Sequence, residues 1–208
     1  MLLAGVLIDE ITDKGFKDLG IKDSKQILPN KREQLAEIIK DRSIDYEIVL
    51  TTADQIDQNL NSGTNLNSVE AIKTAKIINK IIERNLDKKI NIVVDCPSTN
   101  TKAWQDEVIS LLTTTDNLEI SCEHKADVNH VSVAAASILA KTTRDAEIEK
   151  LKKKIGKNFG SGYASDPTTI EFLQKQGSNH LNDGLIRTTW QTWKKQAAKK
   201  NQKGLSEY

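Results

Sequence analysis

Two aspartates, Asp95 and Asp127, occupy positions where a divalent metal ion could be held. Asp95 follows the apolar run Ile90–Val94, and functional groups in open α/β sheets collect at the carboxyl ends of strands. Asp127 ends the polar turn Glu123–Asp127, shortly before the run of mostly small residues Ala134–Ala140. Small side chains let a helix approach its neighbour closely. A helix over this run should therefore pack tightly and hold the turn before it rigidly in place. Two acids from two elements are what a metal-dependent phosphodiesterase site requires.

Each of these acids also has an ordinary structural interpretation. Asp95 could cap the helix that follows its strand, and Asp127 could be a surface-turn acid paired with Lys125. We favour a functional role because the two acids and the small-residue segment occur together. His124 and His130 flank Asp127 and could be ligands, although a hydrogen-bonded surface role is commoner for such residues. The sequence has no Cys/His spacing of a zinc site.

A glycine-rich segment, Gly160, Ser161 and Gly162 followed by Tyr163, is the second candidate. Successive backbone N–H groups in such a loop can form a nest that binds an anion. Tyr163 could stack on a sugar or a base. The alternative is an ordinary turn with a packing tyrosine. The chain contains no P-loop.

Positive charge is localised, although the chain as a whole is nearly neutral, with 30 basic and 29 acidic residues. Ser24 and Lys25 could contact phosphate. Clustered lysines and arginines can follow a phosphate backbone, although a solvated helix face is an equally ordinary interpretation. The clustered basic residues form two C-terminal groups: Lys150, Lys152, Lys153, Lys154 and Lys157, then Arg187, Lys194, Lys195, Lys199, Lys200 and Lys203.

Length and composition bound the class of protein. A chain of 208 residues with 38% hydrophobic residues suits one domain, or one domain with a small appendage. Two cysteines make no disulfide framework and indicate a reducing compartment. The apolar start is too short for a secretory signal, and no apolar run approaches the roughly 20 residues that span a membrane. We expect a soluble, cytoplasmic monomer without a membrane partner.

Hydrophobic periodicity predicts strands that alternate with helices, and therefore α/β layers. We expect a catalytic domain over residues 1–142 and a helical region that contacts nucleic acid over residues 143–208. A polar loop with Gly15 and Gly20 should follow the first strand. The expected strands are 1–8, 46–52, 90–95 and 118–122, and the expected helices are 29–42, 66–86, 102–112, 130–156, 167–176 and 185–197.

Four blocks of sequence, in this order, resemble type 2 ribonuclease H (ribonuclease HII), most like its archaeal branch. The resemblance implies an RNase H-like mixed sheet flanked by helices. It also implies cleavage of the RNA strand of RNA–DNA hybrids, nicking at ribonucleotides embedded in duplex DNA, and two Mg²⁺ or Mn²⁺ ions held by four carboxylates. The blocks are Leu19–Lys25, Val93–Asp95 with Pro97 and Asn100, Glu123–Lys141 running on to Arg144 and Asp145, and Gly160–Pro167.

The matching positions assign roles by resemblance. Asp95 and Asp127 match two of the four metal-binding carboxylates. Tyr163 matches the tyrosine that packs against the sugar at the RNA–DNA junction. Ser24 and Lys25 match residues near the nucleic-acid backbone. A sliding clamp is a further partner that the resemblance suggests.

The chain departs from the family at its start. The family opens with a central strand that leads into an Asp-Glu-Ala-Gly-Arg-Gly motif, which supplies the other two carboxylates, and this motif is absent here. Asp9 and Glu10 are adjacent acids, but they follow the segment that matches the family's second strand. They therefore do not replace the missing motif. We therefore expect Met1 to be an internal methionine of a longer gene product, with the first strand missing from this chain.

Two competing interpretations stay open. The chain as given could be a non-catalytic remnant of the same fold that still binds nucleic acid. It could also be a different α/β enzyme, such as a small phosphatase. That enzyme would need its own nucleophile or phosphate loop, and the sequence shows neither.

Overall fold

The strands of the described chain form two separate two-stranded sheets. In the computed structural model, which describes residues 1–205 and the side chains of residues 1–198, β1 (Leu2–Leu7) pairs antiparallel with β2 (Asp45–Leu50). β3 (Ile90–Asp95) pairs parallel with β4 (Leu118–Glu123). All four expected strands are confirmed to within two residues at each end. Both antiparallel and parallel pairing are present, as expected for a mixed sheet, but each occurs in a separate sheet.

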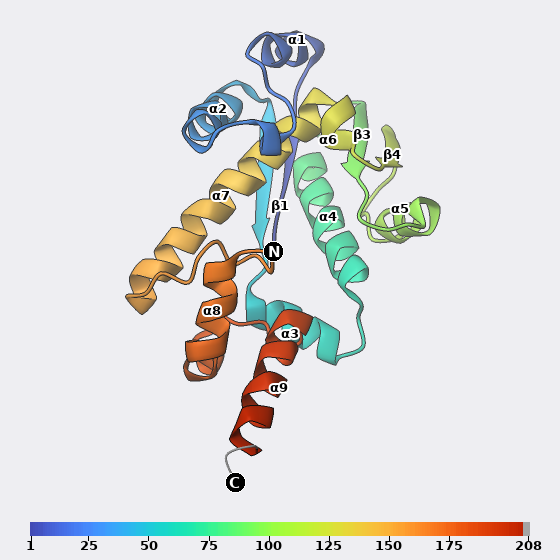
Figure 1. Cartoon of the computed structure of the whole chain (residues 1–208). Helices are drawn as coiled ribbons and strands as arrows, with labels where there is room; N and C mark the ends of the chain where they lie inside the picture. Colours follow the sequence, from blue (N-terminus) through green and yellow to red (C-terminus); the bar gives the residue numbers. More distant parts are fainter. Residues whose placement is uncertain (206–208) are drawn as a thin grey trace. The chain divides into compact units, whose positions relative to one another are not determined.

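Helices make up most of the rest of the chain (Figure 1). Two short 3-10 turns, Ser24–Gln26 and Gly177–Asp183, accompany them. The helices are α1 (Glu10–Asp18), α2 (Pro29–Arg42), α3 (Ala53–Asn61), α4 (Leu66–Glu83), α5 (Thr101–Ser110), α6 (Ala126–Asn129), α7 (Val131–Ile155), α8 (Pro167–Gln176) and α9 (Gln191–Leu205).

The chain divides into two compact units. The sheet unit contains residues 2–50 and 66–143, and the helical unit contains Met1, residues 51–65 and the chain from Arg144 onward. Helix α7 contributes residues to both units. The sequence pattern gave no indication that residues 51–65, which include α3, group with the C-terminal region. Within residues 1–205, none of the helices combines the length and apolar character needed to cross a bilayer.

Helix α1 replaces the polar loop that was expected after the first strand. The Asp9 side chain caps the helix and accepts a hydrogen bond from the Thr12 backbone N–H at 2.7 Å. Phe16 is completely buried and anchors the helix on the core. Gly15 is tolerated inside the helix because one glycine costs only about 1 kcal/mol relative to alanine.

The last helix begins later than the expected residue 185. The segment before it is held by Asp57, whose carboxylate accepts hydrogen bonds from the backbone N–H groups of Thr188 (2.5 Å) and Thr189 (3.2 Å). In the same unit Trp193 is buried in a cluster with Leu173 and Ile186, and Trp190 packs against this cluster. The side chains of three residues in the expected basic group lie outside the described part: Lys199, Lys200 and Lys203.

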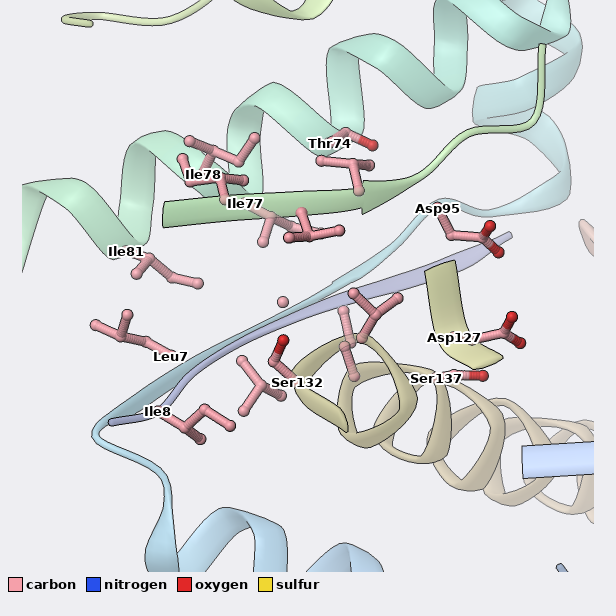
Figure 2. A pocket seen from close by; sticks show the side chains of 18 of the residues that line it. Leu7, Ile8, Thr74, Ile77, Ile78, Ile81, Asp95, Asp127, Ser132 and Ser137 are labelled. Carbon is pink, nitrogen blue, oxygen red and sulfur yellow. The ribbon is translucent and has the colours of Figure 1, made fainter. Parts of the chain in front are cut away.

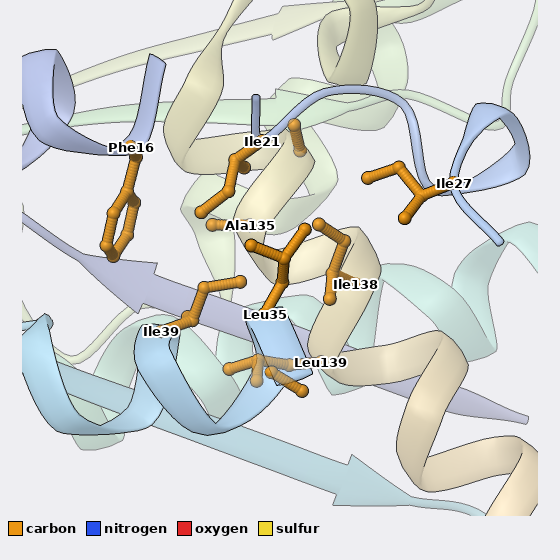
Figure 3. Packing of buried hydrophobic residues seen from close by; sticks show 10 residues of the cluster. Phe16, Ile21, Ile27, Leu35, Ile39, Ala135, Ile138 and Leu139 are labelled. Atoms are coloured by element: carbon orange, nitrogen blue, oxygen red, sulfur yellow. The ribbon is translucent and has the colours of Figure 1, made fainter. Parts of the chain in front are cut away.

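One core cluster of the sheet unit lies among α1, α2, α7 and the turn between α1 and α2 (Figure 3). Leu35 and Ile39 of α2 are completely buried and pack with Ile138 and Leu139 of α7. Ala134 and Ala135 of α7 are also almost inaccessible. The small side chains therefore allow the close approach of α7 that their pattern predicts.

Truncation of one core side chain should be costly. We expect Leu35→Ala to lower the free energy of unfolding by about 2–5 kcal/mol, because it leaves a cavity at a site with no solvent exposure. Leu86→Ala is the matched control, since Leu86 is 72% exposed and should lose well under 1 kcal/mol. Urea unfolding of both variants provides the comparison, and equal losses would place Leu35 outside the core.

Candidate active site

Asp95 and Asp127 lie at the same end of a groove in the sheet unit (Figure 2). Asp95 is the last residue of β3 and is opposite Glu123 in the parallel pairing. Its Oδ1 accepts a hydrogen bond from the Ala126 backbone N–H at 3.2 Å, in the first turn of α6. Asp127 is the next residue of that helix. The contact therefore brings the two acids predicted from the sequence into one site.

The surroundings of Asp127 disfavour its negative charge. Its side chain is only 8% exposed, and burial raises the pKa of the Asp127 carboxyl, with the negative charge of Asp95 adding to the effect. The nearest cation, Lys25, compensates only in part, because its Nζ lies 3.8 Å from Asp127 Oδ2. Two carboxylates with too little positive charge nearby favour the binding of a cation.

This donor set fits a hard divalent cation. Mg²⁺ commonly keeps several waters and is bound through one or two carboxylates together with substrate phosphates. Asp95 and Asp127 supply two such carboxylates. Among the described residues, those of this site included, no group of three or more His, Cys, Asp or Glu side chains is arranged to hold a metal.

The turn before α6 has an unusual backbone. Lys125 has a φ of +58°, in the left-handed region that non-glycine residues seldom adopt. This conformation turns the chain from β4 into α6 and sets the direction of Asp127. The ion-pair partner of Asp127 is Lys25, rather than Lys125 as in the alternative interpretation.

The two histidines beside Asp127 have protein partners. His124 Nδ1 donates to the backbone oxygen of Cys96 at 3.2 Å. His130 Nε2 lies 3.1 Å from Glu123 Oε2. These contacts agree with hydrogen-bonded roles for the two histidines, which was the commoner of the two interpretations.

Ser24 and Lys25 lie in the 3-10 turn of the sheet unit. Ser24 is buried, and its Oγ lies 2.9 Å from Ser137 Oγ of α7. Asp23 caps the turn by accepting a hydrogen bond from the Lys25 backbone N–H at 2.9 Å. Lys25 itself has a side chain that is 82% exposed. The turn is thus fixed to α7 and presents the lysine beside Asp127.

The Gly160–Tyr163 loop belongs to the helical unit, where its backbone N–H groups have partners. Ser161 N–H donates to Asp166 Oδ2 at 2.5 Å, and Gly162 N–H donates to Thr169 Oγ1 at 3.0 Å. The hydrogen bond from Ser161 lowers the pKa of the Asp166 carboxyl to about 2. These N–H groups are used inside the protein, which favours the turn interpretation over an anion nest.

Tyr163 presents its ring beside Arg144, a residue that the sequence reasoning did not place in the site. The Arg144 guanidinium carbon lies 3.7 Å from the centre of the Tyr163 ring, a cation–π arrangement. Arg144 Nη2 also donates to the Ser161 backbone oxygen at 2.6 Å. Tyr163 is 44% exposed. The Arg144 guanidinium thus covers one face of the Tyr163 ring.

Comparison with known proteins identifies the family. The family model described as ribonuclease HII matches residues 1–193. The chain belongs to the ribonuclease HII family. It is 40% identical over 193 residues to ribonuclease HII of Methanococcus maripaludis strain C6, an alignment that covers 93% of this chain and 77% of that protein.

Solved structures of ribonuclease HII proteins share the fold. The ribonuclease H2 of Pyrococcus horikoshii OT3 superposes with a TM-score of 0.78 at 33% identity, over 97% of this chain and 99% of that one. Ribonuclease HII of Archaeoglobus fulgidus, solved in complex with PCNA, gives 0.77 at 33% identity, over 92% and 86% of the two chains. The expected RNase H-like fold is therefore confirmed.

The loop of this ribonuclease HII chain depends on a glycine at position 160. Gly160 has a φ of +77°, and an added Cβ would lie 2.5 Å from Asp166 Oδ2 and 2.9 Å from the backbone nitrogen of Thr169. Gly160→Ala should therefore cost more stability than the roughly 1–2 kcal/mol of left-handed strain alone. Gly156→Ala is the control, since its φ is +69° but no atom lies within 4 Å. Urea unfolding measures the difference, and equal losses would show that the contact with Asp166 is unimportant.

Proposed function

We propose that this chain is an endonuclease that cleaves the RNA strand of RNA–DNA hybrids and nicks duplex DNA at embedded ribonucleotides. Its cofactors would be two divalent ions, Mg²⁺ or Mn²⁺. The observation that carries the proposal is the pair Asp95 and Asp127 at one end of the groove, with the charge of Asp127 left undercompensated. Membership of the ribonuclease HII family supports the substrate class.

The two acids would divide the chemistry between them. Divalent ions, when bound, lower the pKa of water and stabilise the charge that develops on a phosphodiester. Asp95 would bind the ions from the end of β3, and Asp127 would bind from α6 and help to position the attacking water. Lys25, which is exposed beside Asp127, would supply positive charge to a phosphate. The products would be a 3′-hydroxyl and a 5′-phosphate.

Other residues would bind the nucleic acid. Tyr163 would lie against the sugar at the RNA–DNA junction, with Arg144 holding its ring. Gly160, Ser161 and Gly162 would shape that loop, and Ser24 would keep Lys25 in place through its contact with α7. In this proposal residues 1–142 carry the catalysis and the basic helical region over residues 143–208 contacts the duplex backbone.

A cleavage assay tests the proposal. A hybrid whose RNA strand is labelled at its 5′ end would be incubated with the chain in Mg²⁺ or Mn²⁺, and in excess EDTA. We expect metal-dependent cuts in the RNA strand, and none in the DNA strand or in EDTA. A hybrid that stays intact in both metals would contradict catalysis by this chain.

The competing proposal is a non-catalytic protein that binds the same nucleic acids. It is favoured by the small number of acids, since the described residues offer two carboxylates at the site and no third ligand. Salt-dependent binding of a fluorescent hybrid, measured beside the cleavage assay, separates the two proposals. Binding without cleavage would support the competing proposal.

A sliding clamp is a further proposed partner, because the related Archaeoglobus fulgidus protein was solved with PCNA. Size-exclusion chromatography of this chain with and without an archaeal clamp tests the interaction, and also tests the expectation that the chain alone is a monomer. Unchanged elution of both proteins would argue against a complex. A cytoplasmic location is likewise proposed, because two cysteines make no disulfide framework and are typical of a reducing compartment.

A further inference from the structure

Lys25 forms the ion pair with Asp127 that the structure describes. Its Nζ lies 3.8 Å from Asp127 Oδ2. This separation is longer than a hydrogen bond, so the attraction is electrostatic and the ammonium can leave without breaking a directional contact. The two partners differ in exposure, since the side chain of Asp127 is 8% exposed and that of Lys25 is 82% exposed. The lysine is therefore the partner that can move away.

The backbone beneath this lysine is fixed. Ser24 is buried, and its Oγ lies 2.9 Å from Ser137 Oγ of α7. The Lys25 backbone N–H donates to Asp23 Oδ1 at 2.9 Å. Ile27, which follows the turn, is buried in the core cluster that contains α2 and α7 residues. The four-carbon stem of the lysine and its ammonium are thus the parts that can change position.

The charges around Asp127 explain why an ammonium is held there. Burial is the largest cause of the raised pKa of Asp127, and the negative charges of Asp95 and Asp23 add to it, whereas Lys25 acts in the opposite direction. The ammonium therefore compensates part of an excess of negative charge. A divalent ion carries twice its charge and would compensate more.

A divalent ion and this ammonium compete for the same carboxylate. Hard divalent ions bind carboxylate oxygens directly. The Lys25 ammonium already lies 3.8 Å from one of the Asp127 oxygens. Two cations this close to one oxygen repel each other, and the repulsion is relieved when the ammonium moves into the solvent that surrounds it. The ion pair and metal binding at Asp127 therefore oppose each other.

We infer that Lys25 is a displaceable counter-ion of Asp127, which holds the carboxylate in the metal-free chain and is released when a divalent ion binds. Lys25 thus lowers the metal affinity of the chain. Its released ammonium is then available to a phosphate. The inference rests on the proposed metal site and adds a residue that regulates it.

A titration with Mn²⁺ of the whole chain, followed by the electron paramagnetic resonance signal of the free ion, tests this inference. Lys25→Met keeps an unbranched stem and removes the charge. We expect it to bind Mn²⁺ about two- to fivefold more tightly than the unmodified chain at low salt, since ion pairs with an exposed partner have effects of this size. The difference should shrink in about 0.5 M KCl, because salt screens the ammonium. A variant that was merely misfolded would bind more weakly.

Two further variants show whether the effect belongs to position 25. Lys25→Arg keeps the charge and should bind Mn²⁺ as the unmodified chain does. Lys22→Met removes the same charge from an exposed lysine of the same segment and should change the affinity much less. Equal tightening by Lys22→Met and Lys25→Met would overturn the inference, because net charge alone would then explain it. Equal or weaker binding by Lys25→Met would also overturn it.

Acetylation of lysine amines, read by mass spectrometry, tests the release itself. An amine held as an ammonium beside a carboxylate reacts slowly, so Lys25 should react faster in saturating Mg²⁺ than in EDTA, with Lys22 unchanged. An unchanged rate at Lys25 would overturn the release.

The titration also separates this inference from the proposed function. Weaker Mn²⁺ binding by Asp95→Asn, with no effect of Lys25→Met, would leave the metal site standing and overturn the role of Lys25. Absence of saturable Mn²⁺ binding by the unmodified chain would overturn both.

Discussion

Replacing Asp95 with asparagine should reduce hydrolysis of an RNA–DNA hybrid by about 10²–10³-fold in Mg²⁺. Electrostatic groups that stabilise a transition state typically have effects of this size. Asparagine has nearly the same shape, and its oxygen can still accept the hydrogen bond from the Ala126 N–H. The loss would therefore report on the carboxylate charge rather than on the fold. Initial rates with a labelled hybrid, at saturating substrate, measure the effect.

Asp87→Asn is the matched control for this variant. Asp87 belongs to the same unit, its side chain is 87% exposed, and it lies outside the groove. We expect its rate to equal that of the unmodified chain. If Asp95→Asn also kept its full rate, Asp95 would have no part in the reaction.

Asp127→Asn should have opposite effects on activity and on stability. Hydrolysis should fall by about 10²-fold or more, because the second carboxylate is lost. In EDTA the same variant should melt at a higher temperature, because it removes a buried charge that Asp95 repels. A gain of about 1 kcal/mol corresponds to roughly 2–4 °C for a chain of this length. Equal melting temperatures at neutral pH would show that the charge of Asp127 is well compensated.

The pH dependence of this difference has a definite sign. The pKa of Asp127 is raised in the folded state, so its ionisation destabilises the folded chain as pH rises through that pKa. The advantage of Asp127→Asn should therefore be small at acidic pH, where the aspartate is protonated, and should grow toward neutral pH. Melting curves in EDTA over this range measure it. A difference that shrank as the pH rose would contradict the raised pKa.

The sequence predicts the elements of the sheet unit well, because their hydrophobic periodicity is strong. β3 is an apolar run that ends at Asp95, and the strand has the bounds that the run indicates. Helix α1 was not predicted, since it has few apolar residues, and its one buried residue, Phe16, belongs to a core cluster with residues of α2 and α7 that are distant in the sequence. Local pattern cannot show such tertiary anchoring.

The site could be predicted only in part for the same reason. Asp95 ends a recognisable strand and Asp127 follows shortly after the end of the next strand, so the rule that functional groups collect at the carboxyl ends of strands brings them together. Arg144 lies where the third matching block continues, but the sequence assigned it no role in the site, because its contact with Ser161 spans 17 residues. The use of the Ser161 N–H by Asp166 was equally hidden, although an aspartate before Pro167 is a recognisable helix cap.

The most direct test of the account is a titration of the whole chain with Mn²⁺, followed by the electron paramagnetic resonance signal of the free ion. We expect saturable binding by the unmodified chain, and at least tenfold weaker binding by both Asp95→Asn and Asp127→Asn, with Asp87→Asn unchanged. Equal Mn²⁺ affinity in all four proteins would show that residues 95 and 127 do not bind the ion, and would contradict the proposed site.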